Sequence, residues 1–228
     1  MQHYYPTLLD IPSSLSLPKT IFLDAFGTLF GVRGSVGQIY SEIASKYGVN
    51  CAPELLNKHF YTAFQAAAPG IFPGVPTADI PSCEWNWWRA INRQTFTAAG
   101  TIEQFEDFDV FFEDLYRYFT TSAAWKIYPD VIPALTNWQR SGVELAIISN
   151  FDSRLHTVLE VLGLNHYFST VTISSAVSAA KPQAEIFTTA LSKQRCSPES
   201  AWHIGDSLED DYLGASNAGL TAIWLNRG

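Results

Sequence analysis

The chain has 228 residues, of which 47% are hydrophobic, so it can bury a sizeable core and is expected to be globular. Its formal net charge of −8 argues against nucleic acid or an anionic membrane as a partner, because either would need a basic surface. No apolar stretch approaches the length that spans a bilayer, which also argues against a membrane protein.

Residues 1–19 form an N-terminal extension without the basic and apolar regions of a signal peptide. Their prolines and serines indicate either an extended arm beside the first strand's neighbours or a disordered tail. The three cysteines, Cys51, Cys83 and Cys196, are widely spaced and follow no metal-ligand pattern. We expect them to be reduced thiols of a cytoplasmic protein.

The first predicted element is a buried strand over residues 20–23, Thr-Ile-Phe-Leu, a short run of β-branched and aromatic residues. Asp24 follows this strand directly, and Gly27 and Thr28 come soon after. Open α/β sheets bind their ligands beyond the carboxyl ends of the strands, so this position suits a functional carboxylate.

Residues 34–122 are predicted to form a separate helical domain. Hydrophobic residues recur there at helical spacing in four stretches, and no strand pattern separates them. We expect Ser82 to cap the third helix, and Thr101 with Gln104 to open the fourth through a capping box. The dense aromatic residues of this block are expected to form its core.

From residue 125 onward the pattern alternates between helix and strand, which indicates a parallel sheet with right-handed crossovers. The strands are expected over residues 144–149, 170–174, 201–204 and 221–225. Together with residues 20–23 they predict a five-stranded, Rossmann-like α/β core built from residues 20–33 and 123–228. The helical domain is therefore an insertion after the first strand.

Polar residues gather where the predicted strands end. Asp24 follows the first strand, Ser149 and Asn150 end the second, Lys181 lies just beyond the third, and Asp206 follows the fourth. Because the carboxyl ends of parallel strands lie along one edge of a sheet, these side chains are expected to converge.

The converging residues predict a site for Mg²⁺ and an anion. Asp24 and Asp206 would lie close together, and two like charges cannot both remain ionised unless a cation lies between them. Oxygen ligands and partial hydration suit Mg²⁺. Ser149 can hydrogen-bond a bound anion, and Lys181 can neutralise it.

These four motifs, in this order and with a helical insertion after the first, resemble the haloacid dehalogenase-like hydrolase superfamily, in its subfamily with a helical C1 cap. The resemblance spans residues 19–228. Residues 149–155, Ser-Asn-Phe-Asp-Ser-Arg-Leu, and the pair Trp87–Trp88 are similar to one narrower branch of the superfamily. The resemblance implies a cap that closes over the active site and selects the substrate.

The resemblance also implies roles for single residues. The counterpart of Asp24 attacks phosphorus and forms an aspartyl-phosphate, and the counterparts of Asp24, the Phe26 carbonyl and Asp206 hold Mg²⁺. Ser149 and Lys181 match the serine and lysine that bind phosphate.

The remaining site residues carry open alternatives. Asp211 matches the second acid of the fourth motif, which orients the lysine or a water molecule, but Asp210 competes for this role. Thr28 and Asn150 are further candidate phosphate ligands. Thr28 is equally suited to capping the turn that follows Asp24.

The first motif departs from the family pattern at Phe26. The phosphatases of the superfamily carry a second aspartate here, which protonates the leaving group and then activates water. Loss of a general acid–base costs about 10²–10⁴-fold in rate, mainly for poor leaving groups. An aryl phosphate, an acyl phosphate or a halide can depart without a proton. We therefore expect phosphatase turnover to be impaired for alkyl phosphates.

Two alternatives to a phosphatase remain. Dehalogenases of the superfamily also carry an aromatic residue at the position of Phe26, but they use no metal and lack an acid that matches Asp206. They need an arginine near the start of the cap, for which Arg33 is the only candidate, although a surface ion pair suits it better. The other alternative is a low-turnover protein that binds phosphate and metal.

The sequence thus predicts a cytoplasmic hydrolase with a small, phosphorylated substrate, Mg²⁺ as cofactor, and no nucleic-acid or membrane partner. It is expected to be a monomer or a weak homodimer. The identity of the substrate is not readable from the helical domain, and fold resemblance alone does not assign it.

Overall fold

The computed structural model describes residues 4–5, 7–11 and 17–227, and the chain divides into two compact units. The α/β unit comprises Met1–Gly31, Ile71–Gly74 and Ile127–Gly228, and the helical unit comprises Val32–Gly70 and Val75–Lys126. Residues Ile71–Gly74 belong to the α/β unit although they lie inside the predicted insertion. Across the described residues, no helix has the length and apolar character needed to cross a membrane.

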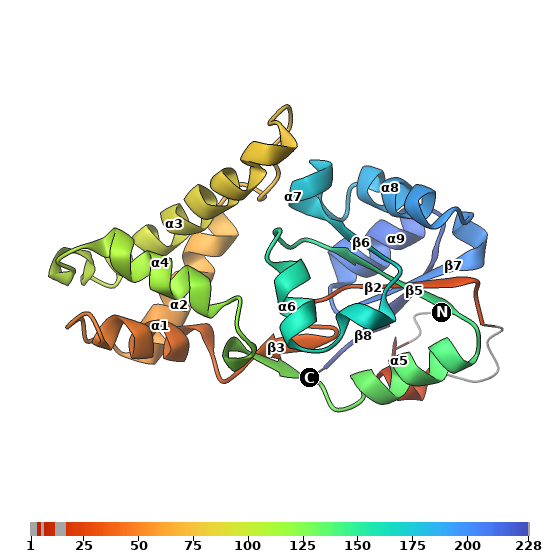
Figure 1. Ribbon diagram of the computed structural model, residues 1–228, viewed down its shortest axis with the longest axis horizontal. Helices are drawn as coiled ribbons and strands as arrows, with labels where there is room; N and C mark the ends of the chain where they lie inside the picture. Colours follow the sequence, from red (N-terminus) through yellow and green to blue (C-terminus); the bar gives the residue numbers. More distant parts are fainter. Residues whose placement is uncertain (1–3, 6, 12–16, 228) are drawn as a thin grey trace. The chain divides into compact units, whose positions relative to one another are not determined.

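The α/β unit is built on a six-stranded parallel sheet (Figure 1). Its strands lie in the order β1 (Tyr4–Tyr5), β8 (Thr221–Leu225), β7 (Ala201–Gly205), β2 (Thr20–Leu23), β5 (Glu144–Ser149) and β6 (Thr170–Ile173). The predicted parallel α/β core with its five strands is confirmed.

The sixth strand, β1, comes from the N-terminal extension and pairs with β8 at the sheet edge. Of the two alternatives for this extension, the extended arm describes Tyr4–Tyr5, whereas residues 1–3, 6 and 12–16 lie outside the described part. A strand of two residues is too short to show the alternation on which sequence reasoning depends.

Strand β2 lies at the centre of the sheet, between β7 and β5, and all four of its residues are buried. In register, Phe22 lies beside Ala146 of β5 and His203 of β7, so these side chains share one face. That face packs on helices α8 (Ala184–Gln194) and α9 (Gly214–Asn217). Burial of large apolar side chains such as Phe22 contributes about 1.5–3 kcal/mol each and holds β2 rigidly in place.

Further helices connect the strands of the α/β unit: α5 (Val131–Arg140), α6 (Leu155–Val161) and the short α7 (Ser174–Val177). The alternation of helix and strand predicts a helix between β7 and β8. The chain there forms a π-helical turn, η7 (Leu208–Leu213), followed by the single turn of α9. This wide turn lies directly after β7, at the position of the fourth motif.

The helical unit contains four α-helices: α1 (Val36–Ser45), α2 (Pro53–Ala66), α3 (Ile80–Ala98) and α4 (Phe108–Tyr118). Two short strands, β3 (Phe30–Val32) and β4 (Trp125–Ile127), pair with each other where the chain passes between the two units. Neither strand was predicted, because three residues give no readable alternation.

Two predicted helix starts in this unit are wrong. Helix α3 begins at Ile80, before Ser82, which lies inside its first turn. Thr101 precedes a short 3₁₀ turn, η3 (Ile102–Gln104), and α4 begins only at Phe108. The Asp107 carboxylate caps α4 by accepting hydrogen bonds from the first amides of the helix. A carboxylate is also favoured by the positive end of the helix dipole.

The core of the helical unit is aromatic, as predicted. Phe96 of α3 is fully buried (0% exposed), and its ring lies 5.1 Å from the rings of both Phe105 and Phe111 and 6.1 Å from that of Tyr40. Edge-to-face and stacked pairs of this kind add stabilisation beyond burial alone. Phe96 is therefore the central packing residue of this unit.

We expect Phe96→Ala to lower the free energy of unfolding by about 3–5 kcal/mol, because it removes buried area and leaves a cavity. Urea denaturation followed by tryptophan fluorescence measures the change. Phe64→Ala, in the same unit but at a side chain that is 41% exposed, is the matched control and should cost only a fraction of this. Equal losses in the two variants would contradict the assignment.

Candidate active site

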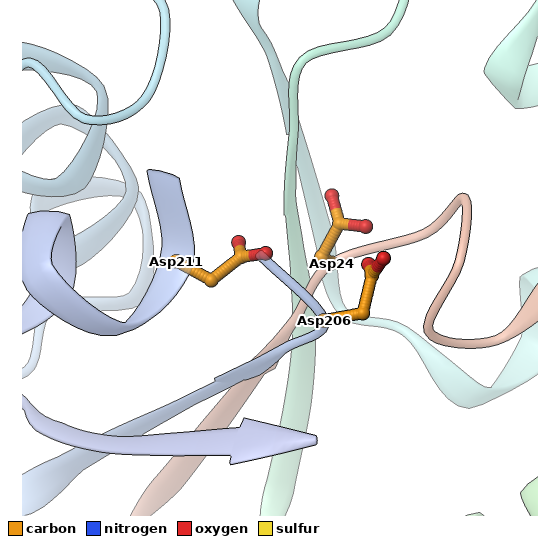
Figure 2. Close-up of side chains that lie close together, drawn as sticks. All are labelled: Asp24, Asp206 and Asp211. Carbon is orange, nitrogen blue, oxygen red and sulfur yellow. The ribbon is translucent and has the colours of Figure 1, made fainter. Parts of the chain in front are cut away.

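The sheet order brings the predicted site residues to one place. Asp24 directly follows β2, which lies between β5 and β7, so Ser149 and Asp206 approach it from the two neighbouring strands. Figure 2 shows the carboxylates of Asp24, Asp206 and Asp211 facing one another. One oxygen from each lies within 4.8 Å of the others, as a metal-binding group would require.

The turn after Asp24 is shaped to admit Asp206. Gly27 has a φ of +87°, and a Cβ atom there would overlap the Asp206 carboxylate. The Thr28 hydroxyl donates to Oδ1 of Asp206 across 3.1 Å. Thr28 therefore positions an acid of the site, and its predicted contact with phosphate stays a prediction.

The backbone of the same turn is held from the end of the chain. Arg227 donates from Nη2 and Nε to the Thr28 carbonyl, at 2.6 and 3.1 Å. Its guanidinium also pairs with Asp130 at 2.9 Å and lies 4.0 Å from the centre of the Tyr128 ring. Sequence reasoning missed Arg227, because 199 positions separate it from Thr28 and no local pattern marks it.

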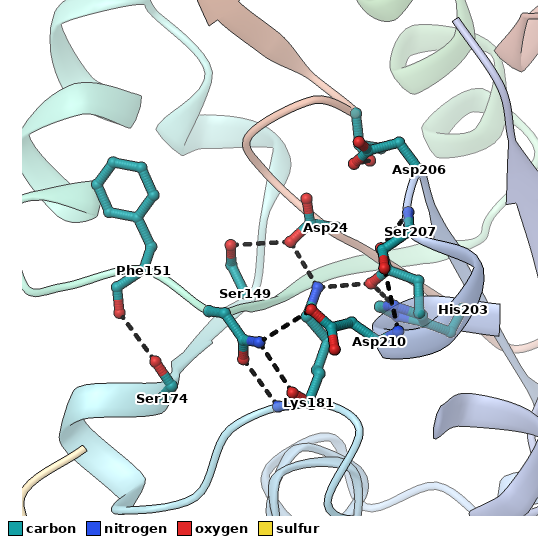
Figure 3. A network of polar contacts seen from close by, with 12 residues as sticks. Asp24, Ser149, Phe151, Ser174, Lys181, His203, Asp206, Ser207 and Asp210 are labelled. Atoms are coloured by element: carbon teal, nitrogen blue, oxygen red, sulfur yellow. Dashed lines mark hydrogen bonds and ion pairs between the residues drawn. The ribbon is translucent and has the colours of Figure 1, made fainter. Parts of the chain in front are cut away.

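Asp24 is buried, with 5% of its surface exposed, and its two oxygens differ in their contacts. Oδ1 accepts from Lys181 Nζ at 2.6 Å and from Ser149 Oγ at 2.9 Å (Figure 3). Within the described residues, Oδ2 accepts no hydrogen bond. Burial raises the pKa of Asp24 and the charge of Asp211 adds to this, although Lys181 and Ser149 favour the carboxylate.

Lys181 lies between two acids, with Nζ 2.6 Å from Asp24 and 2.5 Å from Asp211. Burial alone would lower the pKa of Lys181, but the charges and hydrogen bonds of Asp211 and Asp24 raise it well above its ordinary value. The lysine is thus an ammonium ion that both acids hold in place.

The backbone of Lys181 is fixed by Asn150. The Asn150 amide accepts from the Lys181 N–H at 2.8 Å and donates to the Lys181 carbonyl at 3.0 Å. Its amide nitrogen also lies 3.5 Å from Asp210. These contacts give Asn150 a positioning role, while its predicted contact with phosphate stays a prediction.

Asp211, rather than Asp210, contacts the lysine. Oδ1 of Asp211 accepts from Lys181 and from Nε2 of His203 at 2.8 Å, and Oδ2 accepts from the Ser207 amide at 3.0 Å. Burial alone would raise the pKa of Asp211, but Lys181 and His203 lower it well below its ordinary value. Asp211 is therefore an ionised carboxylate with both oxygens in use.

The π-helical turn explains this choice between adjacent acids. The Tyr212 amide donates to the carbonyl of Ser207, five residues earlier, so the turn holds one residue more than an α-helical turn. This extra residue lets Asp211 face Lys181. Gly205 provides the space for the Asp211 side chain, because a Cβ atom at this position would overlap it.

Asp206 differs from the other two acids in having no cation beside it among the residues that the structure describes. Although its side chain is exposed, the protein around it removes enough water to raise its pKa to about 7, and the charges of Asp24 and Asp211 contribute. A divalent cation would stabilise the ionised form of a carboxylate that lies so close to other acids.

The donor set fits Mg²⁺. Both oxygens of Asp211 are occupied by its own donors, which leaves the carboxylates of Asp24 and Asp206 as candidate ligands. These are hard oxygen ligands of the kind that Mg²⁺ prefers, with few protein ligands and room for water. The predicted ligation by the Phe26 carbonyl stays a prediction.

Asp152 and Arg154 form an ion pair at the start of helix α6. Arg154 donates to the two oxygens of Asp152 from Nε at 2.9 Å and Nη2 at 2.6 Å, and its backbone N–H donates to Oδ1 at 3.0 Å. Both side chains are largely buried. This pairing also argues against Asp152 as a substitute for the acid that is missing at Phe26.

Comparison with known proteins supports the same interpretation. The chain matches the family model described as haloacid dehalogenase-like hydrolase over residues 18–219. It is 34% identical over 208 residues to haloacid dehalogenase-like hydrolase domain-containing protein 3 of Xenopus laevis, covering 91% of this chain and 84% of the relative. This confirms the branch indicated by residues 149–155 and by Trp87–Trp88.

Solved structures show the same fold. A phosphatase of this superfamily from Thermococcus onnurineus is 24% identical with a TM-score of 0.61, covering 92% of this chain and 87% of that chain. The L-2-haloacid dehalogenase from Xanthobacter autotrophicus is 18% identical with a TM-score of 0.63, covering 90% and 76%. At these identities the likeness concerns the fold, which both chemistries share.

The raised pKa of Asp206 predicts how stability depends on pH. Because the folded state holds this proton more tightly than the unfolded state, its stabilisation is present below the ordinary value of 3.8 and is lost as the pH rises through about 7. Without metal, the melting temperature should therefore fall between about pH 5 and about pH 8. Asp206→Asn should reduce this fall.

Added Mg²⁺ should stabilise the protein more at the higher pH, because it competes with the proton for the same carboxylate. Asp109→Asn is the matched control. Arg89 lowers the pKa of Asp109 through a hydrogen bond, so the contribution of Asp109 to stability changes with pH only at low pH. A fall in melting temperature that is the same in Asp206→Asn and in the unmodified chain would contradict the assignment.

Proposed function

The chain belongs to the haloacid dehalogenase-like hydrolase family, and we propose that it is a Mg²⁺-dependent phosphatase that acts through an aspartyl-phosphate on Asp24. The observation that carries this proposal is the uncompensated Asp206 beside the buried Asp24. Such a pair suits a divalent cation and a phosphate, and it would repel a substrate that carries only a carboxylate.

The residues support nucleophilic attack by Asp24. Lys181 and Ser149 hold Oδ1 and so fix the plane of the carboxylate, which leaves Oδ2 as the attacking oxygen. The bond from phosphorus to the leaving oxygen breaks as the new bond forms. Mg²⁺ between Asp24 and Asp206 would neutralise charge on the phosphate. Lys181 adds a fixed positive charge that costs no reorganisation during the reaction.

The leaving group must depart with little help from the chain. Phe26 stands where the family's phosphatases carry an acid, and its side chain is 43% exposed. Both oxygens of the Asp152 carboxylate accept hydrogen bonds from Arg154, so this side chain does not replace the missing acid. We therefore propose that substrates with a good leaving group, such as aryl or acyl phosphates, react faster than alkyl phosphates.

Dehalogenation is the second candidate, because the Xanthobacter autotrophicus dehalogenase shares the fold. Two observations disfavour it. Asp206 adds a negative charge at the site. Arg33 is an exposed residue whose guanidinium donates to the Trp125 carbonyl, and it forms no ion pair with another described residue. A low-turnover protein that binds metal and phosphate is the third candidate.

We further propose a small phosphorylated molecule as substrate for a monomer or weak homodimer in the cytoplasm, without a nucleic-acid or membrane partner. The net charge of −8 supports the last point.

Purified protein should hydrolyse p-nitrophenyl phosphate with Mg²⁺ and lose this activity in EDTA. Asp24→Asn should reduce turnover by about 10⁴-fold or more, because it removes the nucleophile. Release of p-nitrophenolate measures the rate, and Asp114→Asn, a carboxylate of the helical unit, is the matched control.

The same preparation separates the three candidates. Halide release from 2-chloropropionate in EDTA would favour the dehalogenase. Absence of both activities, with Mg²⁺ still bound in calorimetry, would favour the binding protein. Either result would overturn the phosphatase proposal.

Phe26→Asp should accelerate hydrolysis of an alkyl phosphate such as glycerol phosphate by up to about 10²–10⁴-fold, and that of p-nitrophenyl phosphate much less. The reason is that only the alkoxide needs a proton as it leaves. Phe26→Asn is the matched control, because it changes the same side chain without adding an acid. Equal acceleration of both substrates, or none, would mean that the missing acid does not limit turnover.

A further inference from the structure

His203 is a fully buried imidazole to which the proposed reaction assigns no step. It lies inside β7, on the sheet face that it shares with Phe22 and Ala146, and 0% of it is exposed. Its ring packs against Phe187 of α8, with ring centres 5.4 Å apart and the planes at 87°. An aliphatic side chain would pack well on this face, so a buried polar ring there needs a reason.

The contact that explains it is with Asp211. Nε2 of His203 lies 2.8 Å from Oδ1 of Asp211, the same oxygen that accepts from Lys181. The other oxygen accepts from the Ser207 amide. The Asp211 carboxylate is therefore held by three donors from three different segments: a strand, the turn that follows it, and the loop that carries Lys181.

The direction of the hydrogen bond follows from the charge state of Asp211. The lowered pKa of Asp211 keeps it ionised, and a carboxylate only accepts. Nε2 must therefore carry the proton. Nδ1 is buried and has no hydrogen-bond partner among the described residues, so a second proton there would leave an unpaired N–H in an apolar core. His203 therefore presents Nε2–H to Asp211.

We propose that His203 is a positioning residue for the reaction: its Nε2–H fixes Asp211, Asp211 fixes the Lys181 ammonium, and Lys181 fixes Asp24. Without this donor, the Asp211 carboxylate is held among the described residues only by Lys181 at Oδ1 and by the Ser207 amide at Oδ2, so Oδ1 is fixed less firmly. Lys181 would then be fixed less firmly at Asp24.

The inference rests on the proposed phosphatase activity for its kinetic part only. The position of Lys181 is measurable without turnover, because a buried ammonium held by two carboxylates exchanges its protons slowly and gives an NMR signal. The tautomer of His203 is likewise read from the ¹⁵N shifts of its ring nitrogens in the unmodified protein.

The test compares His203→Gln with His203→Leu. The glutamine amide places a donor near the position of Nε2, whereas leucine keeps the packing and removes the donor. We expect His203→Leu to lower kcat for p-nitrophenyl phosphate by about 10–100-fold with little change in KM, as for other outer-shell partners, and to weaken the Lys181 signal. His203→Gln should restore most of both.

Phe187→Leu is the matched control, because it alters the packing around the imidazole and leaves the donor in place, so kcat should stay near that of the unmodified chain. An unchanged kcat in a folded His203→Leu variant would overturn the proposal. Equal losses in the leucine and glutamine variants would also overturn it, because they would show that packing matters and donation does not.

If the unmodified protein hydrolyses no phosphate ester, the proposed function fails and the Lys181 signal in the two variants decides this inference alone. If His203→Leu does not fold, the ¹⁵N shifts decide it instead. A Nδ1–H tautomer in the unmodified chain would overturn the proposal, because it has no donor at Nε2, and a proton on Nε2 would support it.

Discussion

One buried ammonium group between two carboxylates holds the site together. Nζ of Lys181 lies 2.6 Å from Asp24 and 2.5 Å from Asp211, and all three residues are buried. Each charge alone would be costly in this environment, and removing one partner of such a group typically costs about 3–5 kcal/mol. Because the three residues come from distant segments, the contact also ties the end of β2 to the fourth motif and to the loop before α8.

The three acids of the site differ in how many of their carboxylate oxygens accept hydrogen bonds from the chain. Among the residues that the structure describes, donors occupy both oxygens of Asp211 and one oxygen of Asp24, and Asp206 accepts one hydrogen bond, from Thr28. The directions of the pKa shifts follow this order, since the pKa of Asp211 is lowered while those of Asp24 and Asp206 are raised. Unsatisfied negative charge therefore lies on the side of the site where a cation and a phosphate would bind.

Much of the fold was predictable because it depends on local pattern. Strands β2 and β5 contain the continuous apolar runs 21–23 and 145–148, as expected for strands buried on both faces. The pairing of β3 with β4 was not predictable, because three residues give no period. The predicted start of α4 is wrong because the capping-box spacing at Thr101 precedes only a 3₁₀ turn, whereas Asp107 caps the helix.

For the site, the sequence by itself determined which polar side chains stand at strand ends, including Asp24 and Asp206, because a strand and the residue after it are local features. Only the tertiary structure decided that Asp211 rather than Asp210 meets the lysine, and that His203 and Arg227 support the site. A hydrogen bond depends on where donor and acceptor lie in space. No local spacing of residues indicates the width of one helical turn or a hydrogen-bond partner 199 positions away.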